Sequence, residues 1–225
     1  MAVELTKEML EFAKKIDSTM LHVTVTEPEL RDLCEKARDY QFATISVPHH
    51  WMTLAAELLA GSGVGITAGA GYPLGFSTLE TKVFEAVDSV RKGATEVDMT
   101  MAIGPFKSGK YQLVEDEIRA VVEAIPGTLV KVIIETHFLT DDEKKRAAEL
   151  CVKGGAQYVK TSTGYTPTGA TVEDIRLLYA AVGDQIKVKG SGGIRTTAFA
   201  LELLDAGASR LGASKAHLLV EGLRP

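Results

Sequence analysis

Two lysines in the second half of the chain each end a short apolar segment of strand length. Lys160 is followed by the small polar run 161–164, and Lys189 is followed by the glycine turn 190–193. A single lysine at the end of a strand is usually a solvated side chain whose stem covers apolar surface. Two of them, each beside small residues that let a ligand approach the main chain, instead predict an amine that reacts.

Such an amine must lose its proton near neutral pH. A free lysine has a pKa of about 10.4 and is almost wholly protonated at pH 7, so it cannot attack a carbonyl group. Desolvation or a neighbouring cation lowers this pKa. If the two strands are adjacent, Lys189 is a cation that disfavours charge on Lys160. The pair therefore predicts imine formation at Lys160.

Asp98 is the carboxylate expected to work with the lysines. On an inward strand position it can hold a proton or a water molecule and exchange protons with the carbon beside an imine. The alternative is a buried ion pair that only keeps the interior neutral, but this does not explain the glycine loops beside both lysines. Further inward charges should pair across the interior, in a role that could be purely structural, since an unpaired buried charge is costly. Glu96 shares an inward strand face with Asp98, Lys187 with Lys189, and Lys131 with Glu135.

Strand-length apolar segments alternate with amphipathic helical segments along the chain. The strand segments are 20–23, 43–47, 64–68, 96–102, 129–135, 158–162, 186–189 and 210–212, and the helical segments lie near 26–40, 49–60, 77–92, 112–124, 141–153, 171–181, 196–205 and 214–220. This alternation predicts parallel strands joined by right-handed crossovers. Eight such units in 225 residues are typical of a closed α/β (β/α)8 TIM barrel.

The apolar spacing from Met9 to Ile16 adds an extra N-terminal helix to this barrel. A doubly wound open sheet is disfavoured, because no Gly-x-Gly-x-x-Gly motif opens a helix after the first strand. Neither a linker nor a low-complexity segment interrupts the pattern. We therefore predict one domain that spans residues 1–225.

Residues able to do chemistry gather at the predicted strand ends, and a barrel of this class has its active site at that face. Asp17 precedes or opens the first strand, and Asp98 lies within the fourth. The second, fifth, sixth and seventh strands end at Ser46, Glu135, Lys160 and Lys189, and the run 212–214 follows the eighth. Two glycine-containing turns, 191–195 and 211–215, follow the seventh and eighth strands. Backbone amides at these turns commonly bind phosphate in such barrels, so the sequence predicts a phosphorylated substrate.

Composition excludes several classes of partner. A formal net charge of -5 argues against a nucleic-acid groove or an anionic membrane surface. No segment is apolar for long enough to span a bilayer, and the N-terminus lacks the order of a signal peptide, so we expect a cytoplasmic protein. Cys34 and Cys151 fall on apolar helix faces and are predicted to be reduced core thiols.

The histidines raise the question of a metal. A zinc-dependent barrel enzyme is conceivable because His22, His49, His50 and His137 fall near strand ends. However, no His-x-His pair opens the barrel, and the neighbours His49 and His50 should point to different sides. We predict no metal site, with solvated or supporting histidines instead.

Taken together, these segments resemble the deoxyribose-phosphate aldolases, a family of class I lyases. The similar segments are IDST (16–19), GYPLG (71–75), TKVFEA (81–86), GATEVDM (93–99), KVIIET (131–136), VKTSTG (159–164), VKGSGGIRT (188–196) and GASRLG (207–212). The resemblance implies reversible cleavage of 2-deoxyribose 5-phosphate to glyceraldehyde 3-phosphate and acetaldehyde, in deoxyribose phosphate catabolism. It also implies that no metal or organic cofactor is needed.

The resemblance assigns roles residue by residue. Lys160 is similar to the imine-forming lysine, and Lys189 to the lysine that perturbs it and helps to move protons. Asp98 is similar to the group that exchanges protons at the acetaldehyde-derived carbon through ordered water. Substrate contacts are implied for Asp17, which would meet a hydroxyl, for Ser46, Lys131, Thr161 and Gly164, and for Gly192, Gly193, Ala213 and Ser214, which would hold the phosphate.

The chain departs from the family pattern at several positions. Ser18 stands where many members have His, Ser46 where Cys is common, and Gly190 where Ala is usual. Lys215 replaces a small residue and would add a cation near the phosphate, and the end at 223–225 lacks the tyrosine-bearing tail of some members. These departures affect the expected rate and substrate range but leave the imine chemistry intact.

Two other functions fit parts of the pattern. One is a related imine-forming phosphosugar aldolase or transaldolase with a different donor, and the other is a catalytically silent barrel that binds phosphosugars. The expected partners are the phosphosugar and aldehyde substrates, without nucleic acid or membrane. Barrels of this kind often pair through their outer helices, so we expect a homo-oligomer, either a dimer or a tetramer.

Overall fold

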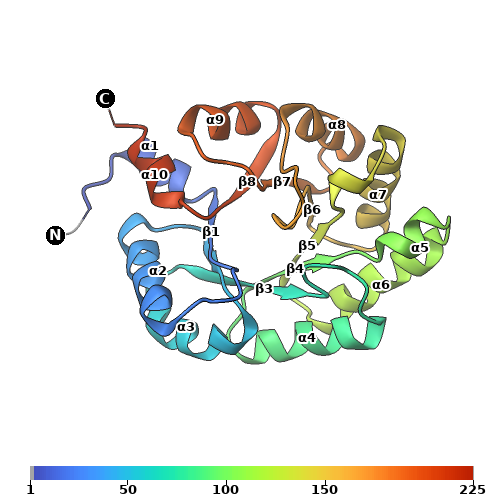
Figure 1. Cartoon of the computed structure of the whole chain (residues 1–225), viewed down its shortest axis with the longest axis horizontal. Coiled ribbons are helices and arrows are strands. Elements are labelled where there is room, and N and C mark those ends of the chain that lie inside the picture. The colour runs from blue at the N-terminus through green and yellow to red at the C-terminus, as the bar shows by residue number, and fades with distance from the viewer. Residues whose placement is uncertain (1–2, 225) are drawn as a thin grey trace.

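The computed structural model describes residues 3–224, and these form a closed barrel of eight parallel strands (Figure 1). The strands are β1 (Ile16–Thr19), β2 (Thr44–Ser46), β3 (Gly65–Ala70), β4 (Glu96–Thr100), β5 (Leu129–Ile133), β6 (Tyr158–Lys160), β7 (Lys187–Ser191) and β8 (Ala208–Ala213). Each strand pairs with its neighbour in chain order, and β8 closes the barrel on β1. The predicted (β/α)8 barrel is confirmed.

Helices surround the barrel as an outer ring (Figure 1). They are α1 (Lys7–Ala13), α2 (Glu27–Tyr40), α3 (Met52–Leu59), α4 (Leu79–Arg91), α5 (Ile103–Lys107), α6 (Tyr111–Ala124), α7 (Asp141–Lys153), α8 (Val172–Val182), α9 (Thr197–Asp205) and α10 (Ala216–Glu221), with 3-10 turns η1 (His49–Trp51) and η2 (Thr136–Phe138). The predicted extra N-terminal helix is α1, which packs against α10. The sequence analysis did not predict α5.

The first strand lies four residues earlier than predicted. The expected strand 20–23 is wrong, because Ile16–Thr19 form β1 and pair with β2 and β8. Val23 is 90% exposed in the loop that follows. The polar residues of β1 hid it from a search for apolar runs, and Asp17 is tolerated inside the barrel only because cations surround it.

Other predicted strands were too long at their C-terminal ends. β4 and β5 end at Thr100 and Ile133, and β6 ends at Lys160 itself. Lys160 is the register partner of Lys189 across β6 and β7, as expected for adjacent strands. The two lysines therefore lie side by side near the mouth of the barrel.

Local signals in the sequence account for the helices that support the barrel. Thr26 and Glu29 form a capping box at the start of α2, with the Thr26 amide donating to Glu29 at 2.8 Å. Cys34 and Cys151 are buried free thiols, as predicted. None of the helices within residues 3–224 is both long and apolar enough to cross a membrane. Residues 1, 2 and 225 lie outside the described residues, so the chain end discussed above, 223–225, is described only in part. The single domain 1–225 stays a prediction.

Candidate active site

Three lysines surround one buried carboxylate at the centre of the barrel. The Nζ atoms of Lys160 and Lys189 lie 2.7 and 2.8 Å from Oδ2 of Asp98. Nζ of Lys131 lies 2.7 Å from the other oxygen, Oδ1. The inward side chains of β4, β5, β6 and β7 thus meet at a single carboxylate, as side-chain alternation on adjacent strands requires.

A second group of buried charges, Asp17, Glu96 and Arg210, contacts the lysines of the first group. Asp17 accepts from Lys189 at 2.5 Å and from Nη1 of Arg210 at 2.6 Å. Glu96 pairs with Lys131 at 2.6 Å and with Arg210 at 3.3 Å. Every one of these buried carboxylates therefore has a cationic partner, which offsets the cost of desolvation.

Two of the expected inward charges behave differently. Lys187 is exposed, and its Nζ lies 5.9 Å from the centre of the Tyr158 ring, so the prediction that it pairs inside the barrel is wrong. Arg210 of β8 supplies the inward cation, which the sequence reasoning missed although it stands two residues before the inward Gly212. Glu135 is buried but hydrogen bonds to threonines rather than to a cation, so that pairing is wrong as well.

Burial and charge give Lys160 an unusual protonation equilibrium. Desolvation lowers the pKa of Lys160 from 10.5 to about 8, with the Lys189 and Lys131 ammonium groups acting in the same direction and Asp98 opposing them. Although burial alone would raise it, the pKa of Asp98 is held well below its usual range by Lys131, Lys160 and Lys189. Near neutral pH the site therefore contains a lysine that can become a neutral nucleophile beside a permanent anion.

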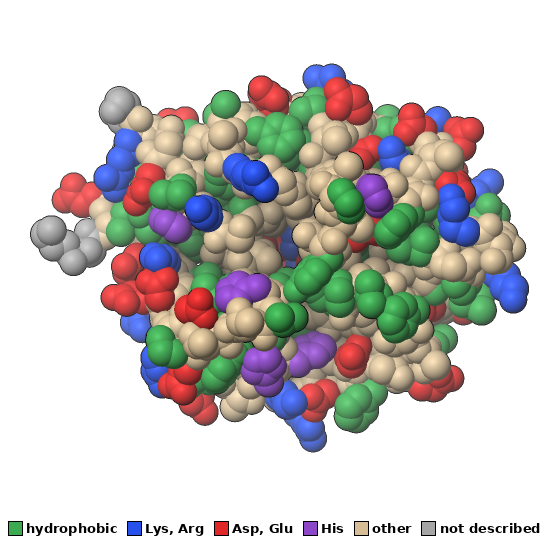
Figure 2. All heavy atoms as spheres, viewed as in Figure 1, with side chains coloured by type: hydrophobic (Ala, Val, Ile, Leu, Met, Phe, Trp, Pro, Cys, Tyr) green, Lys and Arg blue, Asp and Glu red, His purple; other side chains and the backbone are tan. Residues whose placement is uncertain are grey.

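The barrel mouth holds a cavity of about 730 Å³, and Lys160 lies at its inner end. Figure 2 shows the hollow near the centre of this face, with Lys and Arg side chains on one side and a band of hydrophobic side chains on the other. A much smaller inner pocket of about 10 Å³ continues beyond Lys160 and is lined by Asp98, Ser46 and Thr67 among others. The amine thus lies between the large cavity and the small pocket.

The predicted site residues divide between the cavity wall and the layer beneath it. Lys160, Gly164, Gly192, Gly193, Ala213 and Ser214 line the large cavity. Ser46 and Asp98 line the inner pocket. Asp17, Lys131 and Lys189 are buried below as partners of the charges above, and Thr161 is buried against the backbone of Ser191. For all of these residues, the predicted role towards the substrate stays a prediction.

The glycine turn after β7 has the geometry that a close ligand requires. Gly192 and Gly193 have φ values of 85° and 76°, in the left-handed region that favours glycine. A Cβ atom on Gly192 would lie 2.9 Å from Cα of Gly169, so no larger residue fits there without a shift of the backbone. Arg195 and Lys215 also line the cavity near this turn.

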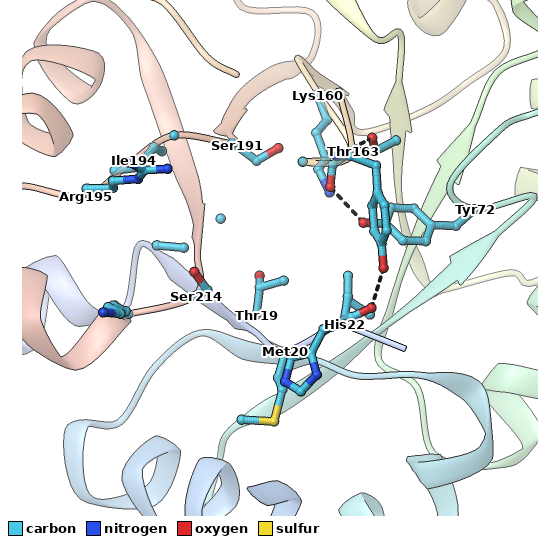
Figure 3. A pocket seen from close by; sticks show the side chains of 18 of the residues that line it. Thr19, Met20, His22, Tyr72, Lys160, Thr163, Ser191, Ile194, Arg195 and Ser214 are labelled. Atoms are coloured by element: carbon cyan, nitrogen blue, oxygen red, sulfur yellow. Dashed lines mark hydrogen bonds between the residues drawn. The ribbon is translucent and has the colours of Figure 1, made fainter. Parts of the chain in front are cut away.

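Two tyrosines that the site prediction did not include cover part of the cavity (Figure 3). The Tyr72 hydroxyl donates to the Thr163 carbonyl at 2.7 Å, and the Tyr165 hydroxyl donates to the Leu21 carbonyl at 2.5 Å. Their rings meet edge to face with centroids 5.9 Å apart. Tyr72 lies in the GYPLG segment and Tyr165 directly follows Gly164, so the motifs contained the only signal for them.

The histidines near the strand ends make individual hydrogen bonds. His49 Nε2 lies 2.7 Å from the Gly69 carbonyl, and His137 Nδ1 lies 2.8 Å from the Thr168 hydroxyl. Within residues 3–224, no group of three or more His, Cys, Asp or Glu side chains could hold a metal ion. A site without metal or organic cofactor stays a prediction.

Known proteins resemble this chain in sequence and in fold. Residues 57–222 match the model of the DeoC/LacD family aldolases. A deoxyribose-phosphate aldolase of Bacillus cereus (strain AH820) is 50% identical over 212 residues, which cover 94% of this chain and 95% of that one.

Solved structures of aldolases also resemble this chain in fold and sequence. A putative deoxyribose-phosphate aldolase from Coccidioides immitis has a TM-score of 0.94 at 36% identity, covering 100% of this chain and 89% of that one. The deoxyribose phosphate aldolase from Aeropyrum pernix, described as having a unique tetrameric structure, has a TM-score of 0.87 at 31% identity and covers 95% and 91%.

Proposed function

The chain belongs to the DeoC/LacD aldolase family, and we propose that it reversibly cleaves 2-deoxyribose 5-phosphate to glyceraldehyde 3-phosphate and acetaldehyde through an imine on Lys160. The observation that carries the proposal is the buried Lys160, whose pKa is lowered to about 8, at the inner end of a cavity lined by glycine turns. An amine with this pKa is neutral often enough at pH 7 to 8 to attack an aldehyde.

In the first step, neutral Lys160 attacks the aldehyde carbon C1 of the open-chain sugar and forms a carbinolamine. A proton delivered through Lys189 and ordered water converts the former carbonyl oxygen into water, and loss of this water leaves a positively charged iminium ion at the position of the lysine nitrogen. Asp98, whose Oδ2 lies 2.7 Å from that nitrogen, supplies the compensating negative charge. Because this charge is already in place, little reorganisation is needed as the cation forms.

In the second step, the C3 hydroxyl loses its proton, and the C2–C3 bond breaks as C3 becomes the aldehyde of glyceraldehyde 3-phosphate. The electron pair of that bond moves to the iminium and leaves an enamine of acetaldehyde on Lys160. Protonation of its C2 carbon and attack of water then release acetaldehyde. Asp98 is a weak base while three ammonium groups surround it, so we propose that it transfers protons through ordered water together with Lys189.

The phosphate end of the substrate is proposed to lie at the glycine turns after β7 and β8. Amides near Gly192 and Gly193 can approach a phosphate closely, and α9 begins four residues after Gly193, with its positive end toward the cavity side. Ser214 and the exposed Lys215 lie on the turn after β8, the strand that pairs with β7. Asp17 lies below the cavity wall, so its proposed effect on the sugar is indirect: it holds the side chains of Lys189 and Arg210 in place.

The experiment that tests this function is borohydride reduction with acetaldehyde, followed by peptide mass mapping. A reduced two-carbon adduct on Lys160 is expected, and it should disappear in Lys160→Leu while Lys187→Met, on a neighbouring strand but exposed, retains it. Dihydroxyacetone-type donors should give no product, which separates this function from a transaldolase. Phosphosugar binding without any adduct would instead favour a silent binding barrel.

We also propose that the chain forms a homo-oligomer, a dimer or a tetramer, and acts in the cytoplasm as one domain spanning 1–225. The tetrameric relative from Aeropyrum pernix supports the oligomer. Sedimentation velocity tests the assembly, cell fractionation tests the location, and a single calorimetric transition tests the domain count.

A further inference from the structure

Glu135 is a buried carboxylate that the proposed reaction does not use. It lies two residues after β5, is 2% exposed, and has a φ of 51°, in the left-handed region that is uncommon for a residue other than glycine. The ion pairs among residues 3–224 do not include it. A buried anion in an uncommon backbone conformation persists only where its surroundings hold it, and such positions cluster at functional sites.

What holds Glu135 is the loop that follows Lys160, residues 161–171. Its Oε2 accepts from the Thr163 amide at 3.1 Å and from the Thr163 hydroxyl at 2.5 Å. Its Oε1 lies 3.0 Å from the Thr166 hydroxyl, whose single proton is shared between this oxygen and the Thr168 carbonyl at 3.1 Å. Hydrogen bonds to a charged acceptor are stronger than those between neutral groups, so the loop is ordered around this carboxylate.

The order extends from Glu135 to the cavity wall. Because the single proton of the Thr163 hydroxyl goes to Glu135, its oxygen is free to accept the Tyr165 amide, at 3.1 Å. The Tyr165 hydroxyl then donates to the Leu21 carbonyl at 2.5 Å, in the loop that follows β1. One carboxylate thus determines where the half-exposed ring of Tyr165 lies against the cavity.

The same loop supports the glycine turn after β7. The Ala170 amide donates to the carbonyls of Ser191 and Gly192 at 2.9 and 3.1 Å. A Cβ atom on Gly192 would be 2.9 Å from Gly169 and 3.7 Å from Gly164, so the two loops pack backbone against backbone. A displaced loop would therefore displace the proposed phosphate site.

We propose that Glu135 is a positioning residue that fixes the loop 161–171 and so shapes the acceptor half of the cavity, where the phosphate-bearing carbons of the substrate bind. This inference rests on the proposed function. Glu135 has no hydrogen bond to Lys160 or Asp98 and does not line either pocket beside them. Its loss should therefore weaken binding of the phosphosugar and spare imine formation with acetaldehyde.

Two substitutions test the proposal. Glu135→Gln keeps the size but removes the negative charge and replaces one accepting oxygen by an NH2 group. Thr166→Val removes the Thr166 hydroxyl while keeping the shape. We expect KM for 2-deoxyribose 5-phosphate to rise about tenfold in Glu135→Gln and about threefold in Thr166→Val, in line with the cost of small misplacements at active sites. The acetaldehyde concentration that half-saturates the borohydride-trapped Lys160 adduct should stay within about twofold.

Glu117→Gln is the matched control. Glu117 is also 2% exposed, but it lies on α6 and pairs with Lys82, so its loss should lower thermal stability and leave KM unchanged. An unchanged KM in Glu135→Gln with only a lower melting temperature would overturn the proposal. So would an equal loss of acetaldehyde affinity, because it would place the effect at the amine.

Thr166→Val decides the matter if Glu135→Gln does not fold. An unchanged KM in Thr166→Val would then overturn the proposal, and the expected threefold rise would support it. If the unsubstituted chain itself gives neither adduct nor cleavage, the proposed function fails first, and the two failures are thereby distinguished.

Discussion

Replacing Lys189 by methionine should move the pH dependence of the enzyme. The ammonium groups of Lys160 and Lys189 share Oδ2 of Asp98 at 2.7 and 2.8 Å, so their nitrogens are at most about 5.5 Å apart. At an effective dielectric constant of about 20, two unit charges at that distance repel by about 3 kcal/mol. This energy corresponds to about 2 pKa units.

Lys189→Met removes this repulsion, so the pKa of Lys160 should rise from about 8 to about 10. The neutral fraction of Lys160 at pH 7.5 then falls from about a quarter to less than one-hundredth, a decrease of about 70-fold. The rising limb of the pH profile of kcat/KM reports the pKa values of groups in the free enzyme, so it should move to higher pH by about 2 units. Part of the lost activity should return above pH 9.

The assay is kcat/KM for cleavage of 2-deoxyribose 5-phosphate between pH 6 and 10.5, with glyceraldehyde 3-phosphate measured by a coupled dehydrogenase. Lys187→Met is the control, because Lys187 lies on the same strand but is exposed and faces Tyr158. The proposed part of Lys189 in proton transfer should in addition lower the plateau of kcat/KM, an effect that is separate from the movement of the limb. A limb that stays near pH 8 in Lys189→Met would refute the electrostatic reasoning.

Three further predictions concern the buried charges. Lys160→Met should abolish cleavage and still unfold cooperatively, since Asp98 keeps two other ammonium partners; loss of the folded circular dichroism spectrum would contradict this. Burial of the Lys82–Glu117 pair predicts that Lys82→Met lowers the free energy of unfolding in urea by about 3–5 kcal/mol, and that a Lys82→Met/Glu117→Leu double variant recovers most of it. Cationic neighbours hold the pKa of Asp98 and Asp17 below the unfolded value of about 3.9, so their stabilisation is fully present above that pH and is lost progressively as pH falls from it through the lower folded-state pKa values. Asp98→Asn should flatten this acid limb of the stability curve, and an unchanged limb would count against the assignment.

Periodicity predicted most of the fold because the outward faces of barrel strands are apolar. The prediction was wrong where polarity hid the pattern, as in β1, whose Asp17 is inside the barrel. It was also wrong about Lys187, because side-chain alternation predicts which face of a strand a residue lies on but not how deeply it is buried along the barrel axis. Lys187 stands at the open lower end of the barrel, and Arg210 reaches the interior instead.

For the site, the sequence by itself determined which groups carry the chemistry. Lys160 and Lys189 were identified from their strand-end positions and the small-residue turns beside them, and Asp98 from its inward position within a strand, because local alternation dictates an inward direction. These are properties of short segments, so they can be read without knowing what faces them.

Only the tertiary structure decided how the groups pair. Asp98 receives three ammonium groups from strands that are up to 91 residues away in the chain, and Glu135 turns to the loop after Lys160 instead of to a cation. Such choices depend on register, strand closure and depth, and therefore on which donors lie within hydrogen-bond distance. The pKa of Lys160 follows from those distances and from burial, which no local pattern encodes.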